Sequence, residues 1–192
     1  MAKRISLREF QVGLVERLTS AARGESSRAL LGVLAGQNYW LVHLSDAGEI
    51  VPLPPLTAVP LAKPWFAGLV NIRGVLYGVV DFSAFLGGEP TLQNSDARLL
   101  LIGARHGINS ALLVSRTLGL KNPDALDALP VSVEGVATDM QPWAGERYAE
   151  KQGVSNTADA QRLAHAETPG IVWRMLHTKP LLGYSEFLNI GR

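Results

Sequence analysis

The stretch Lys63–Gly87 reads KPWFAGLVNIRGVLYGVVDFSAFLG and is the most apolar part of the chain, yet it contains Asn71, Arg73 and Asp81. In its first half, the heptapeptide GLVNIRG alternates between two faces, as a β-strand does. One face is apolar, and the other becomes polar towards its end, where Asn71 and Arg73 lie. This alternation predicts a strand that ends beside a polar site.

The second half of the stretch predicts a reversal, a second strand and a helical turn. Gly74 permits a tight reversal into VLYGVVDF, whose nearly continuous apolar character is typical of a strand covered on both faces. Phe82, Phe85 and Leu86 follow at the spacing i, i+3, i+4, and Gly87 stands directly behind them. We therefore expect a single helical turn that is closed by glycine.

Composition and charge exclude several classes of partner. The 192 residues, 47% of them hydrophobic, suffice for one large domain or two small ones that share a core. The 18 basic and 17 acidic residues are interspersed and give a formal net charge of +1, so no strong field attracts nucleic acid. The absence of cysteine excludes disulfides and thiolate chemistry and fits a reducing compartment.

The N-terminal segment SLREFQVGLVERLTSAARG, residues 6–24, predicts an amphipathic helix, with a capping-box pattern at Ser6 and Glu9. We expect residues 1–28 to form this helix and a linker, and residues 29–192 to form the main domain. The helix either packs on that domain or binds a partner. No signal-peptide core and no apolar run near the roughly 18 residues of a membrane span occurs, so we expect a cytoplasmic protein without direct membrane insertion.

Short strands and turns account for most of the remaining chain. RALLGVLAG (28–36) and YWLVHLSDAGEIVPL (39–53) predict strands around a turn at GQN, and five prolines in Pro52–Pro64 predict an extended connection. ARLLLIGARHGINSALLVSRTLGL (97–120) predicts two strands, and IVWRMLHTKPLLGYSEFLNIG (171–191) predicts two more and a helical turn. Residues 122–169 lack periodicity, with an irregular insertion at about 141–170 and a short helix at 157–167. The pattern favours all-β barrels over alternating βαβ units.

An internal echo indicates two similar subdomains. VVDFSAFLG, which begins at Val79, and LLGYSEFLNIG, which begins at Leu181, share an apolar pair, an aromatic residue, serine and Phe-Leu. The corresponding positions are Phe82 and Tyr184, Ser83 and Ser185, Phe85 and Phe187, and Leu86 and Leu188. We expect a strand followed by a helical turn at both places.

The sequence contains few signals of catalysis. The common phosphate, dinucleotide, acyl-transfer and zinc motifs are missing. His43, His106, His165 and His177 are far apart in the sequence and have no cysteine beside them, so we expect no metal and no cofactor. The sequence leaves open a catalytic pair of carboxylates that are distant in the chain and meet only in the folded protein.

The tryptophans allow two interpretations, core packing or anchoring of a protein interface. They are Trp40, Trp65, Trp143 and Trp173.

At WFAGLVNIRGVLYGVVDFSAFLG the chain resembles the CheW-like adaptor family of bacterial chemotaxis. The family pattern is Gly, two hydrophobic residues, Asn, a hydrophobic residue, Arg-Gly, and then a strand that ends in Asp and an apolar residue. Asn71, Arg73, Gly74, Asp81 and Phe82 fall on this pattern.

The resemblance extends more loosely over most of residues 29–192. Glu49 and Ile50 in AGEIV resemble the Glu-Ile of an earlier family strand. The chain departs from the family at Gly78, where proline is common, and at Ser115, where an aspartate is usual. The long segment at 141–169 and the N-terminal helix look more like the PilI-like adaptors of the pilus-associated systems that govern twitching motility.

The resemblance implies two SH3-like five-stranded β-barrels that share a core, with an added N-terminal α-helix. It also implies a non-catalytic adaptor, recruited to membrane-associated chemoreceptor arrays. Its partners would be the cytoplasmic tip of a methyl-accepting chemoreceptor and the regulatory domain of a CheA-type histidine kinase.

Arg73 has two roles open to it: it braces its own domain by pairing with Glu49, or it presents its guanidinium to an acidic partner. We expect Glu49, Asn71, Arg73 and Gly74 to bind the receptor in a groove between the barrels, with exposed apolar residues on a barrel end packing on the kinase. Asp81 and Phe82 would belong to the structural motif.

Two alternatives remain. The first is a CheW-like docking or array-positioning module that does not contact the kinase. The second is a small-ligand-binding barrel or a hydrolase whose site is assembled only in space, which a deep pocket with converging acids of perturbed pKa would favour.

Overall fold

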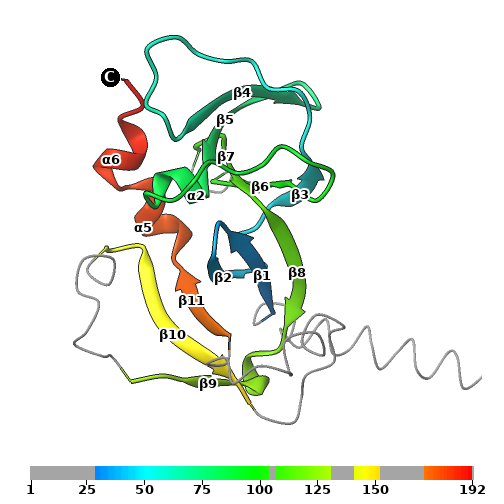
Figure 1. Cartoon of the computed structure of the whole chain (residues 1–192), viewed down its shortest axis with the longest axis vertical. Helices are drawn as coiled ribbons and strands as arrows, with labels where there is room; N and C mark the ends of the chain where they lie inside the picture. The colour runs from blue at the N-terminus through cyan, green and yellow to red at the C-terminus, as the bar shows by residue number, and fades with distance from the viewer. Residues whose placement is uncertain (1–28, 104–106, 131–140, 152–170, 192) are drawn as a thin grey trace, which may run out of the picture.

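The described part of the chain folds into two β-sheets with three short helices beside their junction, as the computed structural model in Figure 1 shows. The structure describes residues 29–103, 107–130, 141–151 and 171–191. The predicted N-terminal helix and the predicted helix at residues 157–167 lie outside the described residues. The all-β class expected from the short strands is confirmed.

The first sheet closes on itself and is called the first barrel here. It contains β1 (Leu30–Ala35), β2 (Asn38–His43), β8 (Arg116–Lys121), β9 (Leu126–Ala128), β10 (Ala144–Glu150) and β11 (Val172–Leu176), in the order β8-β1-β2-β11-β10-β9. The two edge strands, β8 and β9, are halves of one chain segment, interrupted only by the 3-10 turn η3 (Pro123–Ala125). Counted as one interrupted strand, they give the five strands that the family resemblance implied.

Polar contacts join β10 and the residue after it to the segment that contains β8 and η3. The backbone N–H of Lys151, just after β10, donates to the carbonyl oxygen of Ala125 over 2.9 Å. The Lys121 ammonium lies 2.7 Å from a carboxylate oxygen of Glu150 and 4.7 Å from the centre of the Trp173 ring. These contacts hold the β8-η3-β9 segment against β10.

The second sheet forms the second barrel. It contains β3 (Glu49–Pro52), β4 (Phe66–Ile72), β5 (Val75–Asp81), β6 (Arg98–Ile102) and β7 (Ser110–Val114), in the order β3-β6-β7-β5-β4. The edge strands β3 and β4 are connected by the proline-rich residues 53–65, which the sequence predicted to be extended. Thr57 in this connection pairs with Leu69 of β4 through two backbone hydrogen bonds of 2.9 and 2.8 Å.

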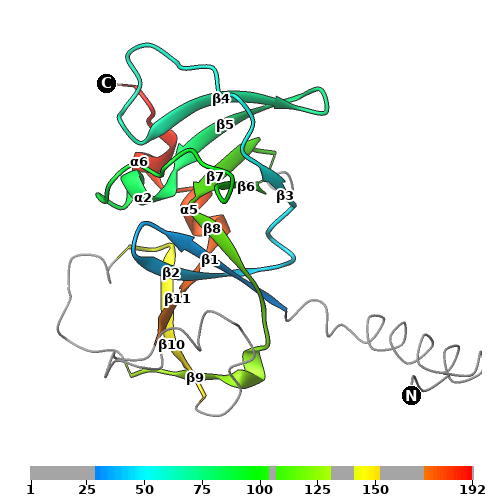
Figure 2. The ribbon, with the colours of Figure 1, turned by 45° about the vertical axis from the view of Figure 1, so that its right-hand side comes forward.

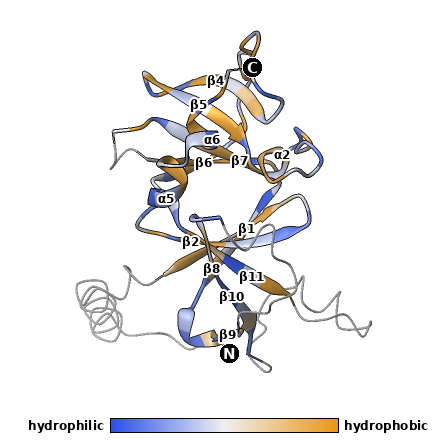
Figure 3. Ribbon diagram, turned by 90° about the vertical axis from the view of Figure 1, so that its left-hand side faces the viewer, coloured by the Kyte–Doolittle hydropathy of each residue, from blue (hydrophilic) through white to orange (hydrophobic). Residues whose placement is uncertain are grey.

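A shared core joins the barrels. Leu100 and Leu112 of the second barrel pack on the same cluster as Val33 and Val42 of the first, and all four are fully buried. Alternate residues of the same strands, such as Leu99, fill the interior of the second barrel. Because β6 and β7 are covered on both faces, their sequences are almost continuously apolar. Figure 3 shows these apolar stretches facing β1 and β2.

The helices α2 (Phe82–Phe85), α5 (Thr178–Leu182) and α6 (Ser185–Leu188) lie beside the shared core, as Figure 2 shows. The rings of Phe85 in α2 and Phe187 in α6 meet edge to face with centroids 5.5 Å apart. The two echoed segments therefore both form helical turns, and these turns contact each other. The strand predicted directly before the second of these helical turns is wrong, because the helix α5 occupies those residues.

The tryptophans pack in the cores. Their exposed fractions are at most 8%, for Trp40, Trp65, Trp143 and Trp173. Of the two roles left open by the sequence, core packing is therefore the one observed.

Two further strand predictions need correction. The second strand predicted within residues 97–120 is two strands, β7 and β8, which separate at Ser115 and belong to different barrels. The irregular segment predicted at about 141–170 is wrong for Ala144–Glu150, which forms β10. The sequence AGERYAE has no apolar face, so only its pairing with β9 and β11 reveals it as a strand.

Candidate functional site

The β4–β5 hairpin ends in a two-residue turn made by Arg73 and Gly74. Both residues have positive φ angles, 53° and 85°, as the common type I′ hairpin turn requires. Arg73 thus lies one residue beyond β4, in the turn itself. The side-chain oxygen of Asn71 accepts a 2.9 Å hydrogen bond from the Gly74 backbone N–H, which fixes the turn.

Arg73 and Glu49 form a bidentate ion pair. Two guanidinium nitrogens of Arg73 donate to the two carboxylate oxygens of Glu49 over 3.0 and 2.7 Å. Glu49 begins β3 and Arg73 follows β4, so the pair connects the two edge strands of the second barrel. The Arg73 side chain is nevertheless 78% exposed. Such an exposed pair stabilises the fold by only about 0.2 to 1 kcal/mol.

Both roles considered for Arg73 are therefore compatible with its position. Pairing with Glu49 occupies two of the five N–H donors of the guanidinium. The high exposure leaves the remaining donors open to an acidic group on another molecule.

Apolar side chains are exposed beside this pair. Ile50 follows Glu49 in β3, Val75 follows Gly74, and Leu76 stands opposite Asn71 in the β4–β5 register. Leu76 is 56% exposed. It lies on the same strand face as Val80, which is buried in the shared core.

We use the name hairpin surface for the exposed polar and apolar residues around the turn. Its members are Glu49, Ile50, Asn71, Arg73, Gly74, Val75 and Leu76. The sequence analysis missed Val75 and Leu76 as surface residues, because it treated the second strand as covered on both sides. Exposure at the start of that strand depends on how far the hairpin extends beyond the sheet.

Asp81 and Phe82 lie away from the hairpin surface, at the other end of β5. The buried Asp81 carboxylate accepts hydrogen bonds from the Ala84 N–H (3.2 Å), the Thr91 N–H (2.7 Å) and the Thr91 hydroxyl (2.8 Å). It thereby caps α2 and fixes the loop that follows. Phe82 is fully buried, with its ring centroid 5.2 Å from that of Trp40.

Two of the four histidines come together in space. His43 and His177 line one cavity at an end of the first barrel, together with Glu146 and Tyr148. Within the part of the chain that the structure describes, no three histidine, aspartate or glutamate side chains form a group that could hold a metal ion. No helix among the described residues is long and apolar enough to cross a membrane.

The fold and the hairpin surface define a class of protein: a two-barrel β scaffold with an exposed surface that is both charged and apolar. The chain belongs to the CheW-like domain family, whose model matches residues 29–144, more than half of the 192 residues. Chemotaxis protein CheW of Rhizobium meliloti is 32% identical over 130 residues, which cover 65% of this chain and 74% of that protein. The family assigns the chain a chemotaxis adaptor role.

The chain is also related to PilI. Protein PilI of Pseudomonas aeruginosa is 26% identical over 123 residues, which cover 59% of this chain and 68% of PilI. The crystal structure of the scaffolding protein TtCheW from Thermoanaerobacter tengcongensis superposes with a TM-score of 0.53 at 15% identity. That match covers 78% of this chain and 88% of TtCheW, and it supports the fold.

Proposed function

We propose that this protein is a non-catalytic cytoplasmic adaptor that couples methyl-accepting chemoreceptors to a CheA-type histidine kinase. The pathway would control twitching motility driven by type IV pili, which the relation to PilI supports. Family membership and the two-barrel fold support the adaptor role. The observation that carries the proposal is the bidentate Arg73–Glu49 pair, held on an exposed turn beside exposed apolar side chains.

The polar part of the hairpin surface would bind the receptor tip. Asn71 and Gly74 set the turn, and the turn holds the Arg73 guanidinium in a fixed place. A fixed guanidinium binds a carboxylate with less loss of side-chain entropy than a free one, because its fork is already oriented. We therefore propose an acidic or amide-rich segment of the receptor as the ligand of Glu49, Asn71, Arg73 and Gly74.

The apolar part of the same surface would contact the regulatory domain of the kinase. Ile50 and Leu76 are exposed by 37% and 56%, which suits packing on a second β-barrel. Signalling through such an adaptor requires that it bind one conformational state of the kinase more tightly than the other. An adaptor with equal affinity for both states would change neither population.

Calorimetric titration tests this proposal. Wild-type protein and Arg73→Glu are each titrated into the regulatory domain of the CheA-type kinase and into the receptor tip from the same organism. We expect saturable binding of the wild type to both partners and weaker receptor binding by the folded variant. Lys151→Glu is the matched control in the first barrel. It reverses one charge and breaks an exposed ion pair with Asp127 and a hydrogen bond to the Asp124 carbonyl oxygen.

The two alternatives predict different results. Receptor binding without kinase binding would favour the docking or array-positioning module. Absence of binding to either partner by folded protein would contradict the adaptor proposal and favour the ligand-binding barrel. Equal receptor binding by the wild type and Arg73→Glu would show that Arg73 is not part of the surface that binds the receptor.

A further inference from the structure

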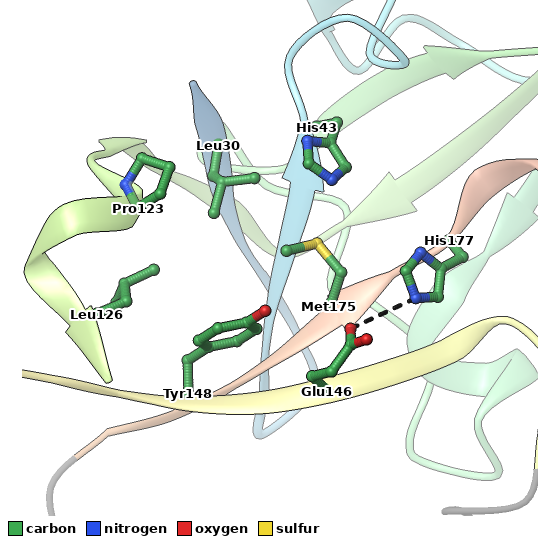
Figure 4. A pocket seen from close by; sticks show the side chains of 8 residues that line it. All are labelled: Leu30, His43, Pro123, Leu126, Glu146, Tyr148, Met175 and His177. Carbon is green, nitrogen blue, oxygen red and sulfur yellow. Dashed lines mark ion pairs between the residues drawn. The ribbon is translucent and has the colours of Figure 1, made fainter. Parts of the chain in front are cut away.

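A cavity of about 380 Å³ opens at an end of the first barrel, and the hairpin surface contributes no residue to it. Figure 4 shows the side chains that line it, which come from five strands, the η3 turn and the residue that follows β11. They are Leu30, His43, Pro123, Leu126, Glu146, Tyr148, Met175 and His177.

The cavity is built by strand alternation. Glu146 and Tyr148 are two residues apart on β10, and Met175 and His177 are two residues apart at the end of β11, so each pair points to one side. Gly145 leaves room for His177, because a Cβ at this position would overlap the imidazole ring. The backbone N–H of His177 donates to the Trp143 carbonyl over 2.9 Å, which further fixes the histidine.

The floor of the cavity is apolar and its walls are polar. Leu30, Leu126 and Met175 are buried. The Tyr148 hydroxyl points into the space between Met175 and Leu30, as Figure 4 shows. Among the residues that the structure describes, neither the Tyr148 hydroxyl nor the His43 imidazole has a hydrogen-bond partner. These two polar groups are therefore available to a bound molecule.

The charged residues that line the cavity determine which sign of charge a bound molecule should carry. Glu146 is the only formally charged residue among the eight at neutral pH, and no lysine or arginine lines the cavity. Its carboxylate lies 3.6 Å from His177 Nε2, too far for a good hydrogen bond, so its acceptor capacity is largely unused. Burial, and secondarily the negative charge of Glu146, raises the pKa of Tyr148, which keeps the phenol neutral.

We propose that this cavity binds a small primary amine with an apolar or aromatic body. The ammonium group would pair with Glu146 and donate to Tyr148 or His43, while the body would contact Leu30, Leu126 and Met175. The volume is near the lower end of the usual range for small-ligand sites, roughly 300 to 1,000 Å³, so the ligand must be small. This inference does not depend on the adaptor function.

Methyl NMR of Met175 in the full-length protein tests the proposal. The chain has three methionines, and Met175 is the one that lines the cavity. We expect saturable shifts of the Met175 methyl signal on titration with phenethylamine. 3-Phenylpropionate has a similar body and the opposite charge. Because the Glu146 side chain is 63% exposed and its charge is screened by water, 3-phenylpropionate should bind about two- to fivefold more weakly.

Two variants sharpen the test. Glu146→Gln should weaken phenethylamine binding by about two- to fivefold, because it removes an exposed charge and keeps the shape. Glu89→Gln, on an exposed loop of the second barrel, should bind like the wild type. No shift of Met175 with wild-type protein would overturn the proposal. Equal binding of the amine and the carboxylate, or no effect of Glu146→Gln, would overturn the assignment of an amine.

Failure of this test and failure of the adaptor proposal are distinguishable. The methyl signal needs no kinase or receptor, and the calorimetric titration needs no amine. If the protein binds its partners but phenethylamine does not change the Met175 methyl signal, the adaptor proposal stands and the amine-binding proposal is overturned.

Discussion

Arg73 forms a contact within the fold and is exposed enough to contact a partner as well. Its sequence context indicated an arginine at the end of a strand, and the structure places it in the turn, paired with Glu49 across the opening between β3 and β4. Because the pair is exposed, water and salt screen it, and its contribution to folding is small. The same exposure makes its charges available for recognition.

A charge swap separates the two roles. Arg73→Glu and Glu49→Arg should each lower the free energy of unfolding by about 0.2 to 1 kcal/mol, because each replaces an attractive pair by a repulsive one. The double variant restores an attractive pair and should recover this stability, as measured by urea unfolding. Receptor binding should stay weak in the double variant, because the surface then presents the opposite charges. Recovery of binding together with stability would show that the pair only braces the fold.

At the scale of elements, the proline-rich connection closes the second barrel. Gly68 in β4 has a φ of 134°, and a Cβ at this position would overlap the Thr57 carbonyl oxygen. This close approach lets Thr57 pair with Leu69 on the otherwise open edge of β4. The glycine is therefore required by a contact between segments that are eleven residues apart, and its own strand gives no sign of it.

Gly68→Ala should destabilise the protein by at least about 2 kcal/mol, because the side chain meets both an unfavourable φ and a backbone atom. Gly183→Ala is the matched control, since its φ of −94° suits alanine and the nearest atoms to a Cβ are 3.7 Å away. It should leave the stability unchanged or raise it slightly. The measurement is chemical unfolding followed by circular dichroism. Similar losses in both variants would contradict this account of the barrel closure.

At the scale of the whole molecule, the shared core predicts that the two barrels unfold as one cooperative unit. The chain crosses between them at Ser115, whose backbone N–H donates to the Leu34 carbonyl of β1 over 2.8 Å. The shared core takes Leu100 from one barrel and Val42 from the other, so neither barrel can keep its packing when the other unfolds. The helical turns α2 and α6 seal the side of this core.

Fluorine NMR with 5-fluorotryptophan tests the cooperativity. Trp173 reports on the interior of the first barrel, and Trp65 reports on the shared core. We expect both signals to disappear at the same urea concentration. Leu100→Ala in the shared core and Leu99→Ala in the second barrel should each lower the free energy of unfolding by about 2 to 5 kcal/mol. Each should lower the urea concentration at which the signals disappear by the same amount for both tryptophans. A Trp173 signal that survives loss of the Trp65 signal would contradict a single unit.

The sequence by itself determined what depends on local patterns. The alternation in GLVNIRG, the glycine at the hairpin turn and the two echoed helical turns all follow from residues close together in the chain, and so does the resemblance that led to the family. The sequence also predicted the pairing of Arg73 with Glu49 as one of two roles for Arg73, the other being contact with an acidic partner.

Only the tertiary structure decided what depends on distant residues meeting. It revealed β10, whose polar sequence becomes a strand only between β9 and β11, and it divided one long apolar run at Ser115 between two barrels. It replaced a predicted strand by α5, where Pro180 is tolerated in the first turn of a helix. It also brought His43, Glu146 and His177 to one cavity, because barrel closure places the ends of β2, β10 and β11 side by side.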